Sequence, residues 1–278
     1  MTERIVIVHA SCNDGFASAM IANMKWPGVR VIHARYNEPP PDVAGKEVWI
    51  FDFSYPRATL EALHAAASSL RLYDHHKTAE AELSGLDYCV FDMERSGCRM
   101  AWDALFTGTP APGWVRLIED RDLWRFNLGA PTRDLHLLLQ TVPRHYARWE
   151  HIFGLAPHEI EAAAQWLQEA RDRRIEMIVA TARIAPIAGV PFVVTNNSDP
   201  SVMSESAAPM CERFSTAQGA AHYFHMVDGM WAFSLRSRGE LDVSGVAKVF
   251  GGGGHHSAAG FRVKALIEVW PEVTQCNT

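Results

Sequence analysis

Short apolar runs alternate with segments of helical periodicity over the first 125 residues of the chain. The β-branched run from Ile5 to Val8 is typical of a strand buried in a parallel sheet. Apolar residues then recur at helical spacing from Phe16 to Met24, and Asn13 and Asp14 precede them as candidate helix caps. The same pattern predicts further strands at 29–33, 48–53, 70–73 and 88–91, and helices at 58–67 and 98–106.

Strands that alternate with helices predict an α/β fold with a doubly wound, mainly parallel sheet. In such sheets, ligands bind at the carboxyl ends of the strands. Asp14 follows the first predicted strand, Asp52 ends the third, and Asp74 and His75 follow the fourth. We therefore expect these side chains to converge at one edge of the sheet.

A long helical segment follows this region and precedes a change in composition. Residues 159–181 are rich in Ala, Gln, Glu, Arg and Leu, as in one continuous helix. Beyond them, strands are expected at 191–195 and 231–235, and a helix at 243–250 leads into a run of four glycines. We predict a first domain over residues 1–156, a linker helix over 157–184, and a smaller α/β domain over 185–278.

Composition narrows the class of protein. The 278 residues are 48% hydrophobic and 21% charged, which is ordinary for a globular protein, and the net charge of -6 differs from that of proteins that coat long nucleic acid. No apolar run approaches the ~18 residues of a membrane span, and the N-terminus does not resemble a signal peptide. We therefore expect a cytoplasmic protein with no membrane partner. The five scattered cysteines include no CxxC pair, which argues against a disulfide framework or a zinc ribbon.

Candidate metal ligands gather in four segments of the first domain. Asp52 stands between Phe51 and Phe53, apolar neighbours that rarely flank a charge without a reason. Carboxylates and imidazoles suit Mn²⁺ or a similar ion, and two such ions ~3.5–4 Å apart can hold both the attacking and the leaving oxygen of a phosphoryl displacement. A single carboxylate bridging two ions would be the natural centre of such a site. The other segments are His9–Gly15, Asp74–His76 and Glu119–Trp124.

The order of these motifs resembles that of a known family. HxxCxDG, an isolated strand-end Asp, DHH, DxDLW and then GGGGHHSAAGF are similar to the motifs of the DHH phosphoesterase superfamily, in the branch with a DHHA1 domain. The resemblance covers nearly the whole chain, and GGGGHHSAAGF at 251–261 is its most specific motif. It implies a DHH catalytic domain, a substrate-binding DHHA1 domain, and hydrolysis by hydroxide made available between two Mn²⁺ ions.

The resemblance also implies roles for particular residues. Asp52 corresponds to a bridging ligand, and either Asp120 or Asp122 to the last ligand, with the spacing to Phe126 favouring Asp122. Asp74 and His76 correspond to catalytic groups that orient the ligands or contact the phosphate. The remaining matches to metal ligands are His9, Asp14 and His75.

The chain departs from the family at its first motif. The family usually has Asp-x-Asp there, and this chain has Cys12-Asn13-Asp14. A thiolate binds metals but favours zinc or iron over manganese, so Cys12 is either a ligand of altered preference or not a ligand. Both alternatives stay open.

The second domain carries candidate substrate-binding residues. Consecutive glycines allow close backbone approach to a ligand, and their N–H groups can bind an anion. Arginine binds phosphate through its planar guanidinium. The candidates are Arg236, Ser237, Gly252, Gly253, Gly254 and His255.

The favoured function is hydrolysis of phosphodiester bonds in a short oligonucleotide or in a linear or cyclic dinucleotide. One alternative is a phosphatase of a small nucleotide such as 3'-phosphoadenosine 5'-phosphate. Another is a nucleotide-binding protein with weakened catalysis, in which Cys12 marks the decay of the metal site. A homodimer is an open alternative to a monomer.

Overall fold

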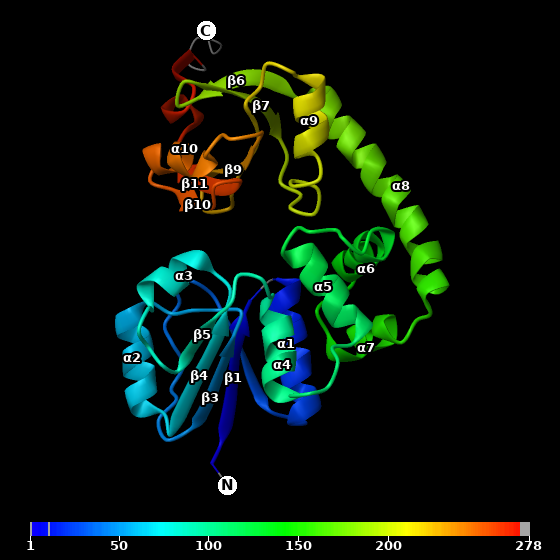
Figure 1. Ribbon diagram of the computed structural model, residues 1–278. Helices are drawn as coiled ribbons and strands as arrows, with labels where there is room; N and C mark the ends of the chain where they lie inside the picture. Colours follow the sequence, from blue (N-terminus) through cyan, green and yellow to red (C-terminus); the bar gives the residue numbers. More distant parts are fainter. Residues whose placement is uncertain (1, 11, 273–278) are drawn as a thin grey trace. The chain divides into compact units, whose positions relative to one another are not determined.

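The computed structural model describes residues 2–10 and 12–272 (Figure 1). The chain divides into two compact units, Met1–Gln165 and Trp166–Thr278, which are called unit 1 and unit 2 below. The boundary between them falls within the long helix α8, Pro157–Thr181, which corresponds to the helix expected from the sequence.

Unit 1 contains a parallel sheet, as predicted. Within the described residues this sheet has five strands in the order β2-β1-β3-β4-β5, and every neighbouring pair is parallel. The strands are β1 Arg4–His9, β2 Arg30–Ala34, β3 Glu47–Phe51, β4 Ser69–Asp74 and β5 Cys89–Phe91. The order reverses beside β1, because the chain adds β2 on one side of it and β3 on the other. Such a switch point is where open α/β sheets bind ligands.

Helices cover both faces of this sheet. Figure 1 shows α1 and α4 on one face and α2 and α3 on the other, which confirms the doubly wound prediction. These helices are α1 Asn13–Lys25, α2 Arg57–Ala66, α3 Lys77–Glu82 and α4 Gly97–Leu105. Unit 1 also contains α5 Gly113–Asp122, α6 Ala130–Thr141 and α7 Tyr146–Phe153, which, like α3, were not predicted from the sequence.

The sheet of unit 1 is apolar because both of its faces are covered. Ile5, Ile7, Ile50 and Leu72 are 0% exposed, and they stand on three adjacent strands. Strands buried on two faces have continuous rather than alternating apolar sequences, which explains the run from Ile5 to Val8.

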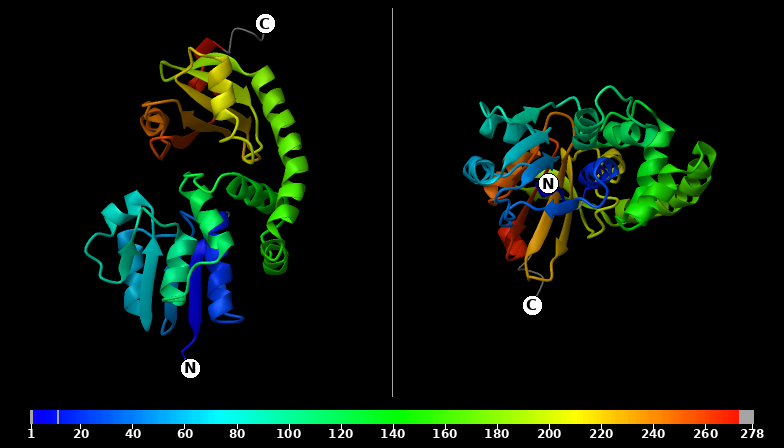
Figure 2. Two further views of the ribbon diagram at one scale, coloured as in Figure 1. Left: turned by 45° about the vertical axis from the view of Figure 1, so that its right-hand side comes forward. Right: turned by 90° about the horizontal axis from the view of Figure 1, so that it is seen from below.

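Unit 2 has a mixed sheet. Within the described residues its six strands lie in the order β10-β11-β9-β8-β7-β6, with β7 and β8 parallel and the other neighbours antiparallel. Figure 2 shows α9 Ala207–Arg213 and α10 Val243–Val249 on opposite sides of this sheet. A short 3-10 helix, η1, covers Leu266–Glu268. The strands are β6 Arg183–Ile187, β7 Val190–Asn196, β8 Gly219–His225, β9 Trp231–Ser237, β10 Gly253–Gly254 and β11 Ala258–Val263.

Each face of the unit 2 sheet has its own apolar core. Val246 and Ala247 of α10 pack with Phe233 and Trp270 on one side, and Met210 of α9 belongs to the cluster on the other. Among the described helices, none combines the length and apolar character needed to cross a bilayer.

Ile7→Ala should destabilise unit 1 by about 2–5 kcal/mol, because it leaves a cavity in a strand that is packed on both faces. Val90→Ala is the matched control, since Val90 is 40% exposed on β5, and it should change stability by about 0.5 kcal/mol or less. Chemical denaturation followed by tryptophan fluorescence measures both. Equal effects of the two substitutions would contradict the packing described above.

Candidate metal centre

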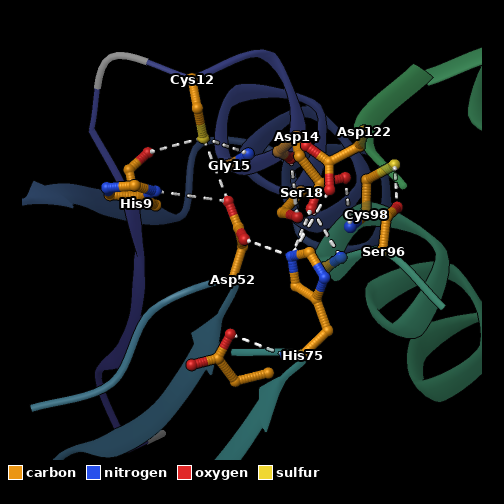
Figure 3. A network of polar contacts seen from close by, with 12 residues as sticks. His9, Cys12, Asp14, Gly15, Ser18, Asp52, His75, Ser96, Cys98 and Asp122 are labelled. Atoms are coloured by element: carbon orange, nitrogen blue, oxygen red, sulfur yellow. Dashed lines mark hydrogen bonds and ion pairs between the residues drawn. The ribbon is translucent and has the colours of Figure 1, made fainter. Parts of the chain in front are cut away.

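The candidate ligands of unit 1 meet at the carboxyl edge of its sheet. His9 is the last residue of β1, Asp52 directly follows β3, and His75 directly follows β4. Asp14 lies in the first turn of α1, and Asp122 is the last residue of α5. Figure 3 shows these side chains gathered around Asp52 and His75. The structure therefore brings together residues from five elements.

The carboxylate of Asp52 stands between two groups of donors. Its Oδ2 accepts a hydrogen bond from Cys12 Sγ at 3.1 Å and lies 3.8 Å from His9 Nδ1. Its Oδ1 accepts from His75 Nε2 at 3.1 Å. The same His75 atom lies 3.9 Å from Asp14 Oδ2 and 3.5 Å from Asp122 Oδ2. One oxygen of Asp52 thus faces each group (Figure 3).

These groups have the composition and spacing of divalent metal sites. The ligand atoms of His9, Cys12 and Asp52 lie within 4.8 Å of one another, and so do those of Asp14, His75 and Asp122. Buried carboxylates need a positive partner, and Asp14 and Asp52 are 1% and 2% exposed. Oxygen and imidazole donors suit a hard or borderline divalent ion. The donors present therefore fit a pair of divalent ions.

Asp14 is held by the N-terminus of α4. Its Oδ2 accepts from Gly97 N at 2.5 Å, and its Oδ1 accepts from Cys98 N at 3.0 Å. The positive end of the helix dipole stabilises a carboxylate at this position. Ser96 caps the same helix by accepting from Arg99 N.

Gly97 also makes room for Asp52. A Cβ atom on Gly97 would lie 2.3 Å from Asp52 Cβ and 2.7 Å from Asp14 Oδ2, so alanine cannot fit without moving one of them. Asp52 itself has φ 58°, a left-handed conformation that non-glycine residues seldom adopt. Local sequence patterns do not reveal this role of Gly97, because its contact with Asp14 spans 83 positions of sequence.

The carboxylates raise the pKa of His75 and of one another. Burial alone would lower the pKa of His75, but its bond to Asp52 and the charges of Asp122 and Asp14 raise it to about 10. Burial raises the pKa of Asp52 to about 6, with the charge of Asp14 adding to the effect and His75 opposing it. Burial and the charges of Asp14 and Asp52 also raise the pKa of Asp122. Without an ion, His75 is therefore protonated at neutral pH, and its positive charge is stabilised by the neighbouring carboxylates.

Cys12 and His9 are neutral in the metal-free protein. Burial and the charges of Asp52 and Asp14 raise the pKa of the Cys12 thiol, which also accepts from Gly15 N at 3.1 Å and so caps α1. The predicted caps Asn13 and Asp14 are therefore wrong, because both residues already lie inside the helix. Burial lowers the pKa of His9, which keeps its imidazole in the form that binds metals.

Asp74 and His76 form a pair beside these groups. His76 Nδ1 donates to Asp74 Oδ1 at 2.6 Å, and Ser54 Oγ donates to Asp74 Oδ2 at 2.6 Å. Burial alone would lower the pKa of His76, but the bond to Asp74 raises it. Asp74 is fully buried, so it orients the imidazole that follows it.

Asp120 lies apart from the candidate ligands, which corrects its inclusion among them. Its Oδ1 accepts from Asn127 N at 2.9 Å, while its Oδ2 accepts from Leu128 N at 3.1 Å and from Thr132 Oγ1 at 2.5 Å. Both oxygens are thus used to fix the loop between α5 and α6. The structure brings Asp122, two residues later, to His75 instead.

The glycines of unit 2 belong to a hairpin. Gly253 and Gly254 form β10 and pair with Gly260 and Ala259 of β11. Gly252 packs so closely that a Cβ atom there would lie 2.2 Å from Gly260 O. A Cβ atom on Gly254 would lie 2.6 Å from Ala258 O, whereas one on Gly253 would meet nothing within 4 Å, so close packing constrains Gly252 and Gly254. His255 is exposed in the turn and donates its N–H to Ala258 O.

The polar candidates of unit 2 lie on the neighbouring strand. Arg236 is partly buried, and its guanidinium donates to Ser204 Oγ at 3.1 Å and to Ser234 Oγ at 3.1 Å. Ser237 ends the same strand, β9. A hollow of about 570 Å³ is lined by Ser234, Gly252 and Arg262.

Sequence comparison identifies a family for the C-terminal third of the chain. Residues 188–275 match the model of the DHHA1 domain family. Among curated proteins, the uncharacterized protein R106 of Acanthamoeba polyphaga mimivirus is 26% identical over 317 residues, covering 98% of this chain and 71% of that protein.

Structural comparison adds three solved proteins. The pGpG-specific phosphodiesterase PggH from Vibrio cholerae has a TM-score of 0.55 at 12% identity, covering 99% of this chain and 97% of its own. RecJ from Thermus thermophilus, solved in complex with Mn²⁺, has a TM-score of 0.54 at 15% identity and covers 98% of this chain and 51% of its own. An exopolyphosphatase-related protein from Bacteroides fragilis has a TM-score of 0.55 at 12% identity, covering 98% of this chain and 89% of its own. At these identities the likeness concerns the fold.

Gly97→Ala should weaken divalent metal binding by about 10- to 100-fold, because the new methyl group displaces Asp14 or Asp52. Gly113→Ala is the matched control, since Gly113 also begins a helix and a Cβ there meets nothing within 4 Å. Metal titration by calorimetry checks both variants. Unchanged affinity in Gly97→Ala would show that the close contact is not needed.

Metal binding at neutral pH should release about one proton from His75, because its raised pKa keeps it protonated until an ion displaces the proton. Apparent affinity should therefore increase with pH up to about 10. A second proton should appear if Cys12 binds as a thiolate. Calorimetry in two buffers of different ionisation enthalpy measures the number released.

His75→Gln should abolish the release from this site. His151→Gln, which removes an exposed histidine of α7, should leave it unchanged. Metal binding without proton release in the unmodified protein would contradict the protonation state assigned to His75.

Proposed function

We propose that this chain is a member of the DHH phosphoesterase superfamily and a metal-dependent hydrolase of phosphodiester bonds in short oligonucleotides or dinucleotides. The observation that carries the proposal is the Asp52 carboxylate, whose two oxygens face different groups of metal donors. A carboxylate in that position is suited to hold two ions at once.

The chain's own residues have distinct tasks in this proposal. His9 and Cys12 would hold one ion with Asp52, and the other ion would be held by Asp14, His75 and Asp122. Divalent ions held there would supply charge neutralisation at the phosphate and would lower the pKa of a water. The donor chemistry and the RecJ neighbour support Mn²⁺ as the native ion, while the soft sulfur of Cys12 favours zinc or iron at its own site.

His76 is suited to hold a proton at the substrate. Its Nδ1 is engaged by Asp74, so its Nε2 is the atom that faces a ligand. The bond to Asp74 raises the pKa of His76, which favours the protonated ring that can donate to a phosphate oxygen or to the leaving oxygen. Asp74 keeps the ring in this orientation.

Unit 2 supplies the second part of the proposal, a grip on the substrate. The candidates for contacting a terminal phosphate are the backbone of glycines 252–254, Ser237, the exposed His255 and the Arg236 guanidinium. The net charge of -6 supports a small nucleotide substrate over long nucleic acid. The pGpG specificity named for the Vibrio cholerae protein supports a dinucleotide.

The Mn²⁺-loaded full chain should hydrolyse 5'-phosphorylated dinucleotides faster than it hydrolyses a 24-mer or 3'-phosphoadenosine 5'-phosphate. A panel that also includes cyclic dinucleotides, measured by chromatography, checks this order. Faster release of phosphate from 3'-phosphoadenosine 5'-phosphate would favour the phosphatase alternative. Absence of turnover with Mn²⁺, Mg²⁺, Zn²⁺ and Fe²⁺, together with retained nucleotide binding, would make the chain a binding protein.

Asp52→Asn should lower kcat by at least about 1,000-fold, because an amide cannot serve both ions and several kcal/mol of transition-state stabilisation are lost. Asp87→Asn, at an exposed aspartate outside the donor groups, should retain near wild-type rates. Circular dichroism verifies that both variants are folded. Wild-type turnover in Asp52→Asn would remove the bridging role.

A further inference from the structure

A cavity of about 240 Å³ opens beside the second group of metal donors, entirely within unit 1. Asp14 and Asp122 contribute to its lining, so the cavity adjoins the proposed metal centre. Its other walls come from the start of α1, from α5 and α6, and from the loop that follows α6. The roles assigned so far to Asp14 and Asp122 do not use this space.

The floor of the cavity is apolar. Leu117 and Ile118 of α5 and Leu135 and Leu139 of α6 line it. Ile118, Leu135 and Leu139 are 5%, 2% and 3% exposed, so the floor is part of the packed interior. Leu135 and Leu139 are four residues apart and therefore share one face of α6.

Polar side chains also line the cavity. His136 and Gln140 of α6 and Arg121 of α5 line the cavity together with Arg144. Arg144 Nη2 donates to Asn13 Oδ1 at 3.1 Å, and the Arg121 guanidinium lies 4.0 Å from the centre of the Trp124 ring. Both guanidinium groups are thus oriented by neighbours. An apolar floor with a few oriented polar groups is the usual composition of a small-ligand site.

We propose that this cavity is a nucleobase subsite, which receives the base of the nucleotide whose phosphate lies at the metal centre. The inference rests on the proposed function and names the feature of the substrate that unit 1 recognises. A phosphate would lose its hydration against Leu135 and Leu139, whereas the faces of a base are apolar. The edge of a base offers acceptors and donors that arginine and glutamine bind with two hydrogen bonds.

The size of the cavity supports one ring system. Pockets for drug-sized ligands range from about 300 to 1,000 Å³, so 240 Å³ is too small for a whole dinucleotide. A base held there would keep the attached phosphate near Asp14 and Asp122. Unit 1 would therefore select nucleotides over other phosphate esters.

The Mn²⁺-loaded full chain should bind GMP and AMP about 10- to 100-fold more tightly than ribose 5-phosphate, which has the same phosphate and no base. Gln140→Trp should reduce this ratio to about 3-fold or less, because the indole fills the cavity. Gln140 is exposed near the end of α6, so the substitution does not disturb the core. Gln165→Trp, at an exposed glutamine of α8, is the matched control and should retain the ratio.

Equal binding of GMP, AMP and ribose 5-phosphate by the unmodified protein would overturn the subsite, and so would an unchanged ratio in Gln140→Trp. Pyrophosphate that binds as tightly as GMP, and that Gln140→Trp weakens, would make the cavity an anion site and overturn the proposal. Base-dependent binding without hydrolysis of any dinucleotide would remove the proposed hydrolase alone. Hydrolysis with base-independent binding would remove the subsite alone.

Discussion

The position of the Asp52 carboxylate is the constraint on which the centre of unit 1 depends. One oxygen faces Cys12 and His9 and the other faces His75, and Asp52 has a left-handed backbone immediately after β3. A non-glycine residue in such a conformation costs about 1–3 kcal/mol and persists only where its surroundings enforce it. Gly97 is part of those surroundings, because its lack of a side chain leaves the space that Asp52 occupies.

The switch in strand order explains why these residues can meet. The chain leaves β1 towards β2 and returns to add β3 on the other side, so the ends of β1 and β3 open onto the same crevice. The N-terminus of α4 closes it and binds Asp14 through two amides. The buried acids raise the pKa of His75. His75 therefore stays protonated until a cation binds and displaces the proton.

Local patterns predicted the strands and the convergence of Asp14, Asp52 and His75, because runs of β-branched residues and strand-end polar residues are properties of short segments. Local patterns could not decide between Asp120 and Asp122 as the metal ligand. Residues two apart on a helix point about 200° apart, so only the orientation of α5 decides which one meets His75. The cavity between α5 and α6 was also beyond prediction, since neither helix was recognised and the role of Gly97 depends on contacts distant in sequence.

The central claim is that one carboxylate joins two ions, and electron paramagnetic resonance of the Mn²⁺-loaded protein tests it most directly. Two ions bridged by Asp52 at about 3.5–4 Å should give a spin-coupled spectrum at two Mn²⁺ per chain. Asp52→Asn should lose the coupling even where an ion is retained. A single ion per chain, or two ions that remain magnetically independent in the unmodified protein, would contradict the account.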